Sequence, residues 1–255
     1  GLPGVRRLAD RFEITSRRGE GTSVVAAKQI VGRPVPSNAA RATDTRIIVP
    51  GAARRADGGC AEAVFDTVSR VRPAPGQSVC GDRALAMEID GGVLCAVVDG
   101  AGHGLAAHQV ATVLTSTLRM DATANLQRLM ERLHDAARGS VGAVAGLAFI
   151  DPAARTVRYV GVGNPRIHRS GHGNWSGFAG DGLLGERLGH PVEQSASFEP
   201  GDVLLMSTDG LRELPARDYL DRSRGTGIAA IGDALMAGVA KPHDDVGCLL
   251  VAWSA

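Results

Sequence analysis

Four aspartates in separate parts of the chain each border a run of apolar residues; they are Asp82, Asp99, Asp209 and Asp244. Asp99 and Asp209 each end such a run, and an apolar run begins shortly after Asp244. A buried strand that meets a carboxylate at its end places that charge at the rim of a sheet. Carboxylate oxygens are the ligands that hard divalent cations prefer. If folding brings the four rims together, the sequence predicts a cage of oxygen atoms for such cations.

Several carboxylates at one rim repel one another unless cations neutralise them. Two unit charges about 4 Å apart interact with roughly 4 kcal/mol at an effective dielectric constant of about 20. Asp244 and Asp245 are adjacent, so two carboxylates stand where the chain enters an apolar run. At any single position a turn or a helix N-cap explains the aspartate as well as a metal does. The metal hypothesis therefore depends on all four positions together.

Size and composition fit one large domain or two small ones. The chain has 255 residues, 44% of them hydrophobic, and a net charge of +1, so composition gives no reason to expect nucleic-acid binding. Residues 1–55 carry a charge of +7 and the remainder −6, an acidic excess that suits a cation site. The sequence shows no signal peptide, no apolar stretch of about 18 residues and no CxxC pair among its four cysteines. We therefore expect a cytoplasmic protein with no membrane segment.

Hydrophobic periodicity predicts strands and helices around these aspartates. Strands are expected at residues 12–17, 22–30, 63–71, 83–89, 93–98, 141–150, 156–162, 166–169, 203–206 and 246–253. Helices are expected at residues 4–10, 106–118, 126–137 and 227–239. The strands come in runs and the helices in blocks, which favours an α+β fold with antiparallel sheets.

Residues 32–58 are rich in Pro, Ala, Arg and Gly, and we expect them to form a linker with one short strand at 46–49. The sequence then divides into three parts: residues 1–31, the linker 32–58, and a domain over residues 59–255.

Taken together and in order, four motifs resemble the metal-dependent type 2C (PPM) protein serine/threonine phosphatases. They are Gly81-Asp82, Asp99-Gly100-Ala101-Gly102-His103-Gly104, Thr208-Asp209-Gly210 and Asp244-Asp245. The resemblance is strongest to the bacterial SpoIIE-type branch and its RsbX-like members, and it covers residues 60–253. It implies a four-layer α-β-β-α sandwich, in which helices flank two antiparallel sheets.

The resemblance also implies a metal site and a reaction. It assigns two Mn²⁺ or Mg²⁺ ions, with Asp99 bridging both and the Gly100 carbonyl binding one of them. Asp209 and Asp244 would bind the other ion, and Asp82 would hold a metal directly or through water. Hydroxide held by the ions would attack the phosphorus of a phosphoserine or phosphothreonine without a phosphoenzyme.

The chain departs from the family pattern at two places. Eukaryotic members carry a histidine immediately after Asp-Gly, where it protonates the leaving alkoxide, whereas this chain has Ala101 there and His103 two positions later. His103 is a candidate for the acid, or else it only caps or packs against the following helix. The family's phosphate-binding arginine has no clear counterpart, and Arg72 and Arg83 are the candidates.

Residues 1–31 resemble the C-terminal end of the anti-sigma-factor type of kinase-like (GHKL) ATPase domain. The matching stretches are residues 1–8, Phe12-Glu13-Ile14 and Gly19-Glu20-Gly21-Thr22. The Asn-bearing helix and the first Gly-rich loop of such domains are missing, so we do not expect ATP binding. The resemblance implies that a kinase-like domain precedes these residues in the parent protein.

A kinase and an opposing phosphatase on one polypeptide would act on the same switch protein. The expected partner is therefore a phosphorylated STAS-domain regulator in a bacterial partner-switching stress response. Two other functions stay open. The first is a pseudophosphatase that keeps the fold as a binding or sensing module, and the second is a nucleotide-binding regulator acting through residues 1–31.

Overall fold

The computed structural model describes residues 11–17, 21–27, 41–54 and 60–254 of the chain. The chain divides into two compact units, residues 1–37 and 38–255. In the first unit, β1 (Arg11–Arg17) and β2 (Gly21–Ala27) pair antiparallel, which confirms two of the predicted strands. The helix expected at residues 4–10 lies outside the described residues.

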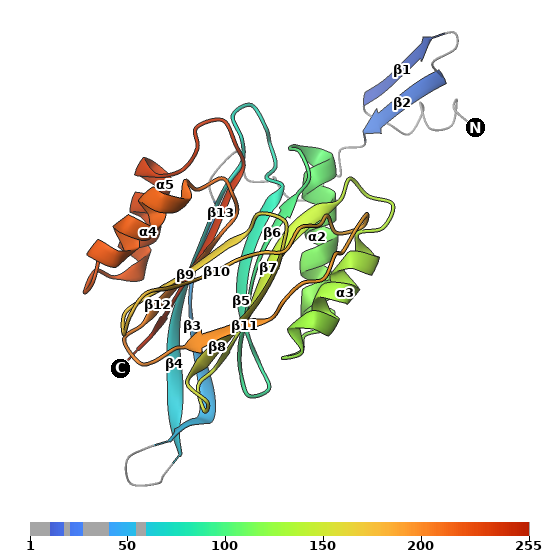
Figure 1. Cartoon of the computed structure of the whole chain (residues 1–255). Coiled ribbons are helices and arrows are strands. Elements are labelled where there is room, and N and C mark those ends of the chain that lie inside the picture. The colour runs from blue at the N-terminus through green and yellow to red at the C-terminus, as the bar shows by residue number, and fades with distance from the viewer. Residues whose placement is uncertain (1–10, 18–20, 28–40, 55–59, 255) are drawn as a thin grey trace. The chain divides into compact units, whose positions relative to one another are not determined.

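The second unit contains two antiparallel sheets (Figure 1). The six-stranded sheet has the order β10-β9-β12-β13-β4-β3, with β3 Arg41–Arg54, β4 Cys60–Arg72, β9 Arg166–Ser170, β10 Trp175–Gly177, β12 Val203–Ser207 and β13 Val246–Trp253. The five-stranded sheet has the order β11-β8-β7-β6-β5, with β5 Asp82–Ile89, β6 Gly92–Gly100, β7 Ala143–Asp151, β8 Thr156–Val162 and β11 Gln194–Ser197.

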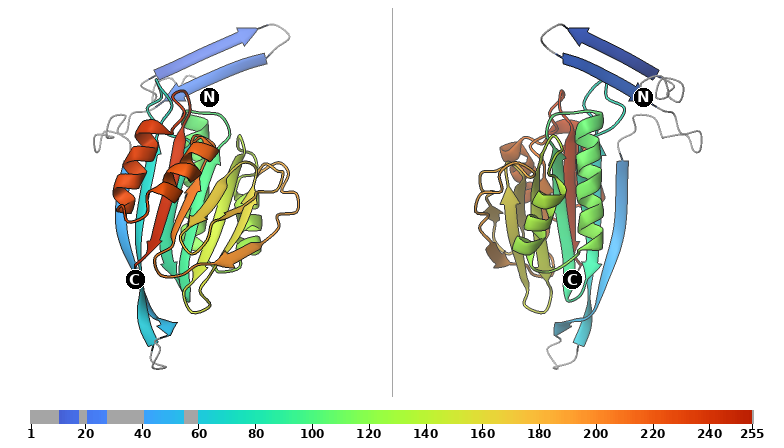
Figure 2. Two further views of the ribbon diagram at one scale, coloured as in Figure 1. Left: turned by 60° about the vertical axis from the view of Figure 1, so that its left-hand side comes forward. Right: turned by 90° about the vertical axis from the view of Figure 1, so that its right-hand side faces the viewer.

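Helices cover the outer faces of both sheets (Figure 2). The pair α2 (Leu105–Met120) and α3 (Leu126–Ala136) packs on the five-stranded sheet, and the pair α4 (Glu213–Arg222) and α5 (Ile228–Gly238) packs on the six-stranded sheet. The expected four-layer α-β-β-α sandwich is therefore confirmed.

Strand β6 shows how the layers position the site. Its even-numbered residues, such as Leu94, pack against α2 and α3, and its odd-numbered residues, such as Val97, pack between the two sheets. Because side chains alternate along a strand, Asp99 lies on the same face as Val97. Asp99 therefore projects from the end of β6 toward the space between the sheets.

The segment expected to be a linker contains a long strand. Strand β3 spans fourteen residues, far more than the four predicted at 46–49, and it pairs antiparallel with β4. Ile47 and Val49 are buried between the sheets, opposite Phe65 and Ala63 of β4, so tertiary packing orders a segment whose composition suggests a loop. A linker over all of residues 32–58 is thus wrong for residues 41–54.

Three shorter elements escaped the sequence analysis: α4, β10 and β11. Helix α4 buries only Ala216 and Leu220, so its hydrophobic periodicity is weak. Strands β10 and β11 have three and four residues, too few to show an alternation.

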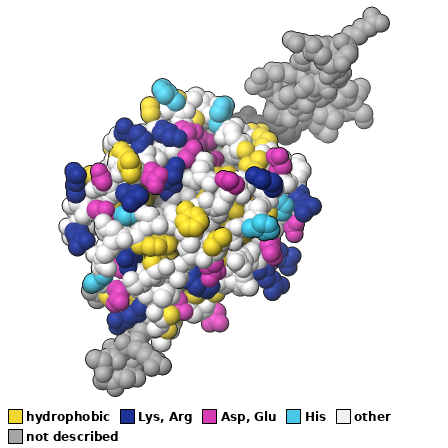
Figure 3. Space-filling model, viewed as in Figure 1, with side chains coloured by type: hydrophobic (Ala, Val, Ile, Leu, Met, Phe, Trp, Pro, Cys, Tyr) yellow, Lys and Arg dark blue, Asp and Glu magenta, His cyan; other side chains and the backbone are white. Residues whose placement is uncertain are grey.

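Basic and acidic side chains intermingle on the face of the second unit shown in Figure 3, in keeping with the small net charge of the chain. Among the described residues, the helices are all too short or too polar to cross a bilayer.

Candidate metal centre

Two of the predicted aspartates lie opposite each other on neighbouring strands. Asp82, the first residue of β5, is the register partner of Asp99 near the end of β6. Residues directly opposite in an antiparallel pair project from the same face of the sheet. Both carboxyl groups therefore enter the space between the sheets, where the apolar cores end.

Asp82 is almost fully buried, with 1% of its surface exposed. Its Oδ2 accepts a hydrogen bond of 2.6 Å from the Thr208 hydroxyl, which in turn accepts one of 3.0 Å from the Gly247 N–H. Its other oxygen, Oδ1, is buried and has no hydrogen-bond partner within the described part of the chain. Burial, reinforced by the charge of Asp99, raises the pKa of Asp82 well above its usual value. An unsatisfied carboxylate oxygen in such a place is what a bound cation would satisfy.

Asp99 is surrounded by other carboxylates. Burial first, and then the charges of Asp209, Asp244 and Asp245, raise the pKa of Asp99 to about 7. Folding has thus brought together four positions that span more than 140 residues of sequence. When ionised, these carboxylates repel one another, and a bound cation would remove that repulsion.

A lysine lies between two of these aspartates. The Lys241 Nζ is 3.5 Å from Asp209 Oδ2 and 3.5 Å from Asp244 Oδ2. Its backbone is fixed on both sides, because its N–H donates to the Gly210 carbonyl and its carbonyl accepts from the Arg72 guanidinium. Sequence analysis missed Lys241, although it is one of only two lysines in the chain.

The two adjacent aspartates before β13 differ sharply. The Asp244 side chain is 45% exposed, whereas Asp245 is buried with 4% of its surface exposed. Asp245 accepts a 2.6 Å bond from the Ala74 N–H and a 2.7 Å bond from the Gly81 N–H. It therefore ties the β4–β5 connection to the start of β13, beside Asp82.

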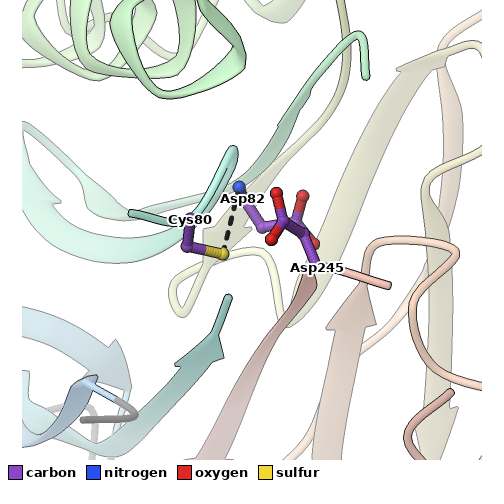
Figure 4. A group of neighbouring side chains, drawn as sticks. All are labelled: Cys80, Asp82 and Asp245. Atoms are coloured by element: carbon purple, nitrogen blue, oxygen red, sulfur yellow. Dashed lines mark hydrogen bonds between the residues drawn. The ribbon is translucent and has the colours of Figure 1, made fainter. Parts of the chain in front are cut away.

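Figure 4 shows Asp245 and Asp82 beside Cys80, and one potential ligand atom from each of the three lies within 4.8 Å of the others. Burial raises the pKa of the Cys80 thiol far above its usual value, and its sulfur contacts the Arg72 carbonyl at 3.3 Å. A protonated thiol is a poor ligand for a hard cation. The oxygen atoms of the aspartates, and not this sulfur, are the donors that fit.

Two glycines let backbones approach closely at the site. A Cβ on Gly210 would lie 2.1 Å from the Asp245 carbonyl oxygen, and one on Gly100 would lie 2.3 Å from the Ala107 carbonyl oxygen in α2. Neither position has room for a side chain. These contacts explain the Asp-Gly pairs physically and hold Asp209 and Asp99 next to their neighbours.

The remaining predicted site residues lie at the edge of this group. His103 is exposed in the turn between β6 and α2, and its ring makes no hydrogen bond to any described residue. Arg72 donates to the Lys241 carbonyl, and Arg83 donates to the carbonyls of Cys80 and Asp82. Both candidate arginines therefore support the backbone around the aspartates.

The donor set fits hard divalent cations. The set is made of carboxylate oxygens, and one of them, Asp82 Oδ1, is buried without a hydrogen-bond partner among the described residues. The negative charges of neighbouring aspartates add to the effect of burial in raising the pKa of Asp82 and of Asp99. Asp82, Asp99, Asp209 and Asp244 are the residues that would hold such ions, together with the Gly100 carbonyl at the end of β6.

Comparison with known proteins points to one family. The family model described as Stage II sporulation protein E (SpoIIE) matches residues 89–254. Phosphoserine phosphatase RsbX of Bacillus subtilis (strain 168) is 26% identical over 177 residues, which are 69% of this chain and 88% of RsbX.

Solved structures share the fold. A crystal structure of RsbX in complex with magnesium has a TM-score of 0.68 and 23% identity, and the match covers 82% of this chain and all of that one. The RsbU and RsbW domains of Rv1364c from Mycobacterium tuberculosis have a TM-score of 0.65 and 21% identity, over 82% of this chain and 64% of that one.

Proposed function

The chain belongs to the SpoIIE family, and from this premise we propose that it is a metal-dependent protein serine/threonine phosphatase whose substrate is a phosphorylated regulatory protein. The observation that carries the proposal is the convergence of Asp82, Asp99, Asp209 and Asp244 at one end of the sandwich, with a buried carboxylate oxygen left unpaired. The alignment with phosphoserine phosphatase RsbX supports the same activity.

In the proposed site, each aspartate would bind one or both of two Mn²⁺ or Mg²⁺ ions. In this proposal Asp99 would hold both ions, the Gly100 carbonyl would hold one of them and Asp209 and Asp244 the other, and Asp82 would bind a metal directly or through water. The ions, when bound, would lower the pKa of a water molecule and neutralise charge on the phosphoryl oxygens.

The chain's own residues prepare this site. The Thr208 hydroxyl holds the Asp82 side chain by donating to Oδ2, which leaves Oδ1 as the oxygen that would be available to an ion. Asp245 holds the β4–β5 connection in place through two backbone N–H groups. His103, exposed in the turn after Asp99, is the proposed donor of a proton to the leaving serine or threonine oxygen.

For the partner, we propose a phosphorylated STAS-domain switch protein that docks as a folded domain. The proposal rests on the resemblance of residues 1–31 to the end of a kinase-like domain, which would place opposing activities in one parent protein. It draws support from the likeness to Rv1364c, in which RsbU and RsbW domains occur together. On this view residues 1–31 are the remnant of the kinase-like domain.

The test compares two substrates with and without metal. The chain and its Asp99→Asn variant are incubated with p-nitrophenyl phosphate and with a phosphorylated STAS-domain protein, in Mn²⁺, in Mg²⁺ and in a chelator. We expect metal-dependent release of phosphate from both substrates by the parent chain and almost none by the variant.

Each other outcome has a distinct meaning. Hydrolysis of p-nitrophenyl phosphate without hydrolysis of the STAS protein would reject the STAS-domain protein as the substrate. It would still support the proposed phosphatase activity. Calorimetric binding of metal without turnover of either substrate would favour a pseudophosphatase. Binding of ATP to the chain would revive the nucleotide-binding alternative for residues 1–31.

A further inference from the structure

Large apolar side chains are exposed on both sides of the candidate metal centre. Leu105 has 63% of its surface exposed, Leu214 has 67% and Val141 has 45%. Single exposed apolar side chains are common on protein surfaces, so the position of these three is what matters. Each lies in a segment that contacts a loop or strand end bearing one of the aspartates. We call Leu105, Val141 and Leu214 the flanking residues.

Leu105 is the first residue of α2, and the first turn of this helix packs against the ends of two aspartate-bearing strands. A Cβ on Gly100 would lie 2.3 Å from the Ala107 carbonyl oxygen, and a Cβ on Gly81 would lie 2.8 Å from the Ala107 Cβ. Each of these glycines is the immediate neighbour in the chain of one of the aspartates. The start of α2 is therefore held next to the candidate metal centre, and its first residue is exposed there.

Val141 lies next to the loop that follows Asp99. The Ala101 N–H of this loop donates to the Gly142 carbonyl at 2.9 Å. Ala143, the first residue of β7, is the register partner of Gly100. Val141 precedes both contacts directly, so it lies at the end of β7 that adjoins the candidate metal centre.

Leu214 lies beside another of the aspartates. It is the second residue of α4, a helix that begins shortly after Asp209. The Lys241 N–H donates to the Gly210 carbonyl at 2.8 Å, and this bond ties the segment between Asp209 and α4 to the segment that carries Lys241. The start of α4 is thus fixed next to Asp209, with Leu214 exposed on it.

The flanking residues belong to opposite sides of the sandwich. Helix α2 covers the outer face of the five-stranded sheet, and α4 covers the outer face of the six-stranded sheet (Figure 2). Cα–Cβ bonds tilt toward the N-terminus of a helix, so Leu105 and Leu214 both tilt toward the end that carries the aspartates. Stacked sheets lie about 10 Å apart and packed helices have a similar spacing, so the two helices are roughly 30 Å apart.

This separation decides which kind of partner reaches both sides. A protein interface of standard size covers about 800 Å² on each partner, which is a patch roughly 30 Å across. A folded domain whose phosphorylated side chain enters the metal centre therefore covers the flanking residues on both sides. Five residues of extended chain span only about 17 Å, so a short phosphopeptide does not.

We propose that Leu105, Val141 and Leu214 form the docking surface for the protein substrate, a folded STAS-domain protein that buries these side chains on both sides of its phosphorylated residue. The inference rests on the proposed function, because the substrate of the metal centre is the protein that covers this surface. The flanking residues set the affinity for the protein substrate and take no part in the chemical step.

The test uses Leu105→Ala, Leu214→Ala and the double variant of the full chain, with Met120→Ala as the matched control. Met120 is 77% exposed and is the last residue of the helix that Leu105 begins, about 22 Å away along the helix axis. Each variant is assayed in Mg²⁺ with p-nitrophenyl phosphate, with a phosphorylated STAS-domain protein, and with a five-residue phosphopeptide taken from that protein. Calorimetry measures binding of the unphosphorylated STAS-domain protein, which cannot be turned over.

We expect the double variant to raise KM for the phosphorylated STAS-domain protein about tenfold with kcat unchanged, and to weaken binding of the unphosphorylated protein by a similar factor. Each single variant should show a severalfold effect. Hydrolysis of p-nitrophenyl phosphate and of the phosphopeptide should stay unchanged, and Met120→Ala should match the parent chain throughout. The substituted side chains are exposed, so the thermal midpoints should not fall and a lost affinity cannot be ascribed to unfolding.

Three patterns in the variants would overturn the proposal. An equal loss of p-nitrophenyl phosphate hydrolysis would indicate a distorted metal centre, and an equal loss with the phosphopeptide would indicate that a folded partner is not required. An equal effect of Met120→Ala would indicate a general loss of apolar surface.

The phosphatase activity and the docking surface are judged separately. Absence of both binding and turnover of the STAS-domain protein would overturn the docking surface, whether or not p-nitrophenyl phosphate is hydrolysed. Binding that the double variant weakens, without hydrolysis of any substrate, would reject the phosphatase activity and support the docking surface.

Discussion

Asp82 and Asp99 are register partners at the end of two neighbouring strands, and their carboxyl groups share one buried space. In the metal-free protein, this pairing places two carboxyl groups that repel each other when ionised at the place where the proposed ions would bind. Four predictions follow from that arrangement and from the groups around it.

The metal-free protein should lose stability as pH rises toward neutrality. The pKa of Asp99 is raised to about 7 in the folded chain, whereas an aspartate in an unfolded chain ionises near pH 4. The folded state therefore binds the proton more tightly, so this contribution to stability is present below about pH 4 and is lost as pH rises through 7. Three pKa units correspond to roughly 4 kcal/mol, an upper bound for a side chain that is not fully buried.

Urea unfolding in a chelator, at pH values between about 5 and 8, measures this effect. In Asp99→Asn, the loss of stability between about pH 5 and pH 8 should be smaller. Excess Mg²⁺ should make the parent chain more stable at about pH 8 than at about pH 5, because it binds the ionised carboxylates. A parent chain in chelator whose stability relative to Asp99→Asn rises with pH would contradict the prediction.

Removing one carboxylate should weaken metal binding without lowering the thermal stability of the metal-free protein. Asp99→Asn and Asp209→Asn should weaken metal binding and lower kcat/KM by about a thousandfold or more, because the bound ions would be needed to lower the pKa of the attacking water molecule. The same changes relieve repulsion, so the metal-free variants should unfold at the same temperature as the parent or a higher one. Calorimetric metal titration beside thermal unfolding gives both readouts, and unchanged metal affinity in both variants would refute the assignment.

The adjacent aspartates before β13 should respond in opposite ways. Asp245→Asn replaces one of the two acceptor oxygens by an NH₂ group, so one of the two buried N–H groups loses its acceptor, and the free energy of unfolding should fall by about 2–3 kcal/mol. Asp244→Asn changes an exposed side chain and should leave stability within about 0.5 kcal/mol while weakening metal binding. Chemical unfolding in chelator tests the first statement and calorimetry the second, and equal stability of the two variants would contradict this division of roles.

Lys241 should compete with the metal. Its ammonium group lies 3.5 Å from both Asp209 and Asp244, so it partly neutralises the carboxylates that the ion would bind. Lys241→Met should therefore tighten metal binding severalfold and destabilise the metal-free protein by less than about 1 kcal/mol, because the pair is substantially exposed. Lys241→Arg keeps the charge and serves as the control. Weaker metal binding in Lys241→Met would show that Lys241 supports the site instead.

Local hydrophobic periodicity predicts much of the fold. Strands β8 and β13 match their predicted ranges, and the helical periodicity over residues 106–118 and 126–137 locates α2 and α3. These elements are long or strongly apolar, so local periodicity is sufficient. Strand β3 was underestimated because its order comes from pairing with β4, a contact that composition does not reveal.

The sequence by itself determined which residues could bind hard cations, because an apolar run that ends in Asp-Gly signals a buried strand with a charge at its rim. Only the tertiary structure decided that Asp245 anchors a loop while its neighbour Asp244 stays exposed, and that Thr208 and Lys241 belong to the site. The physical reason is that the contacts of Thr208 with Asp82, and of Asp245 with Ala74 and Gly81, join residues more than 120 positions apart in the chain. The contact of Lys241 with Asp209 likewise depends on how two separate loops meet. Periodicity tells which face a side chain occupies, but it does not tell which distant side chain shares that face.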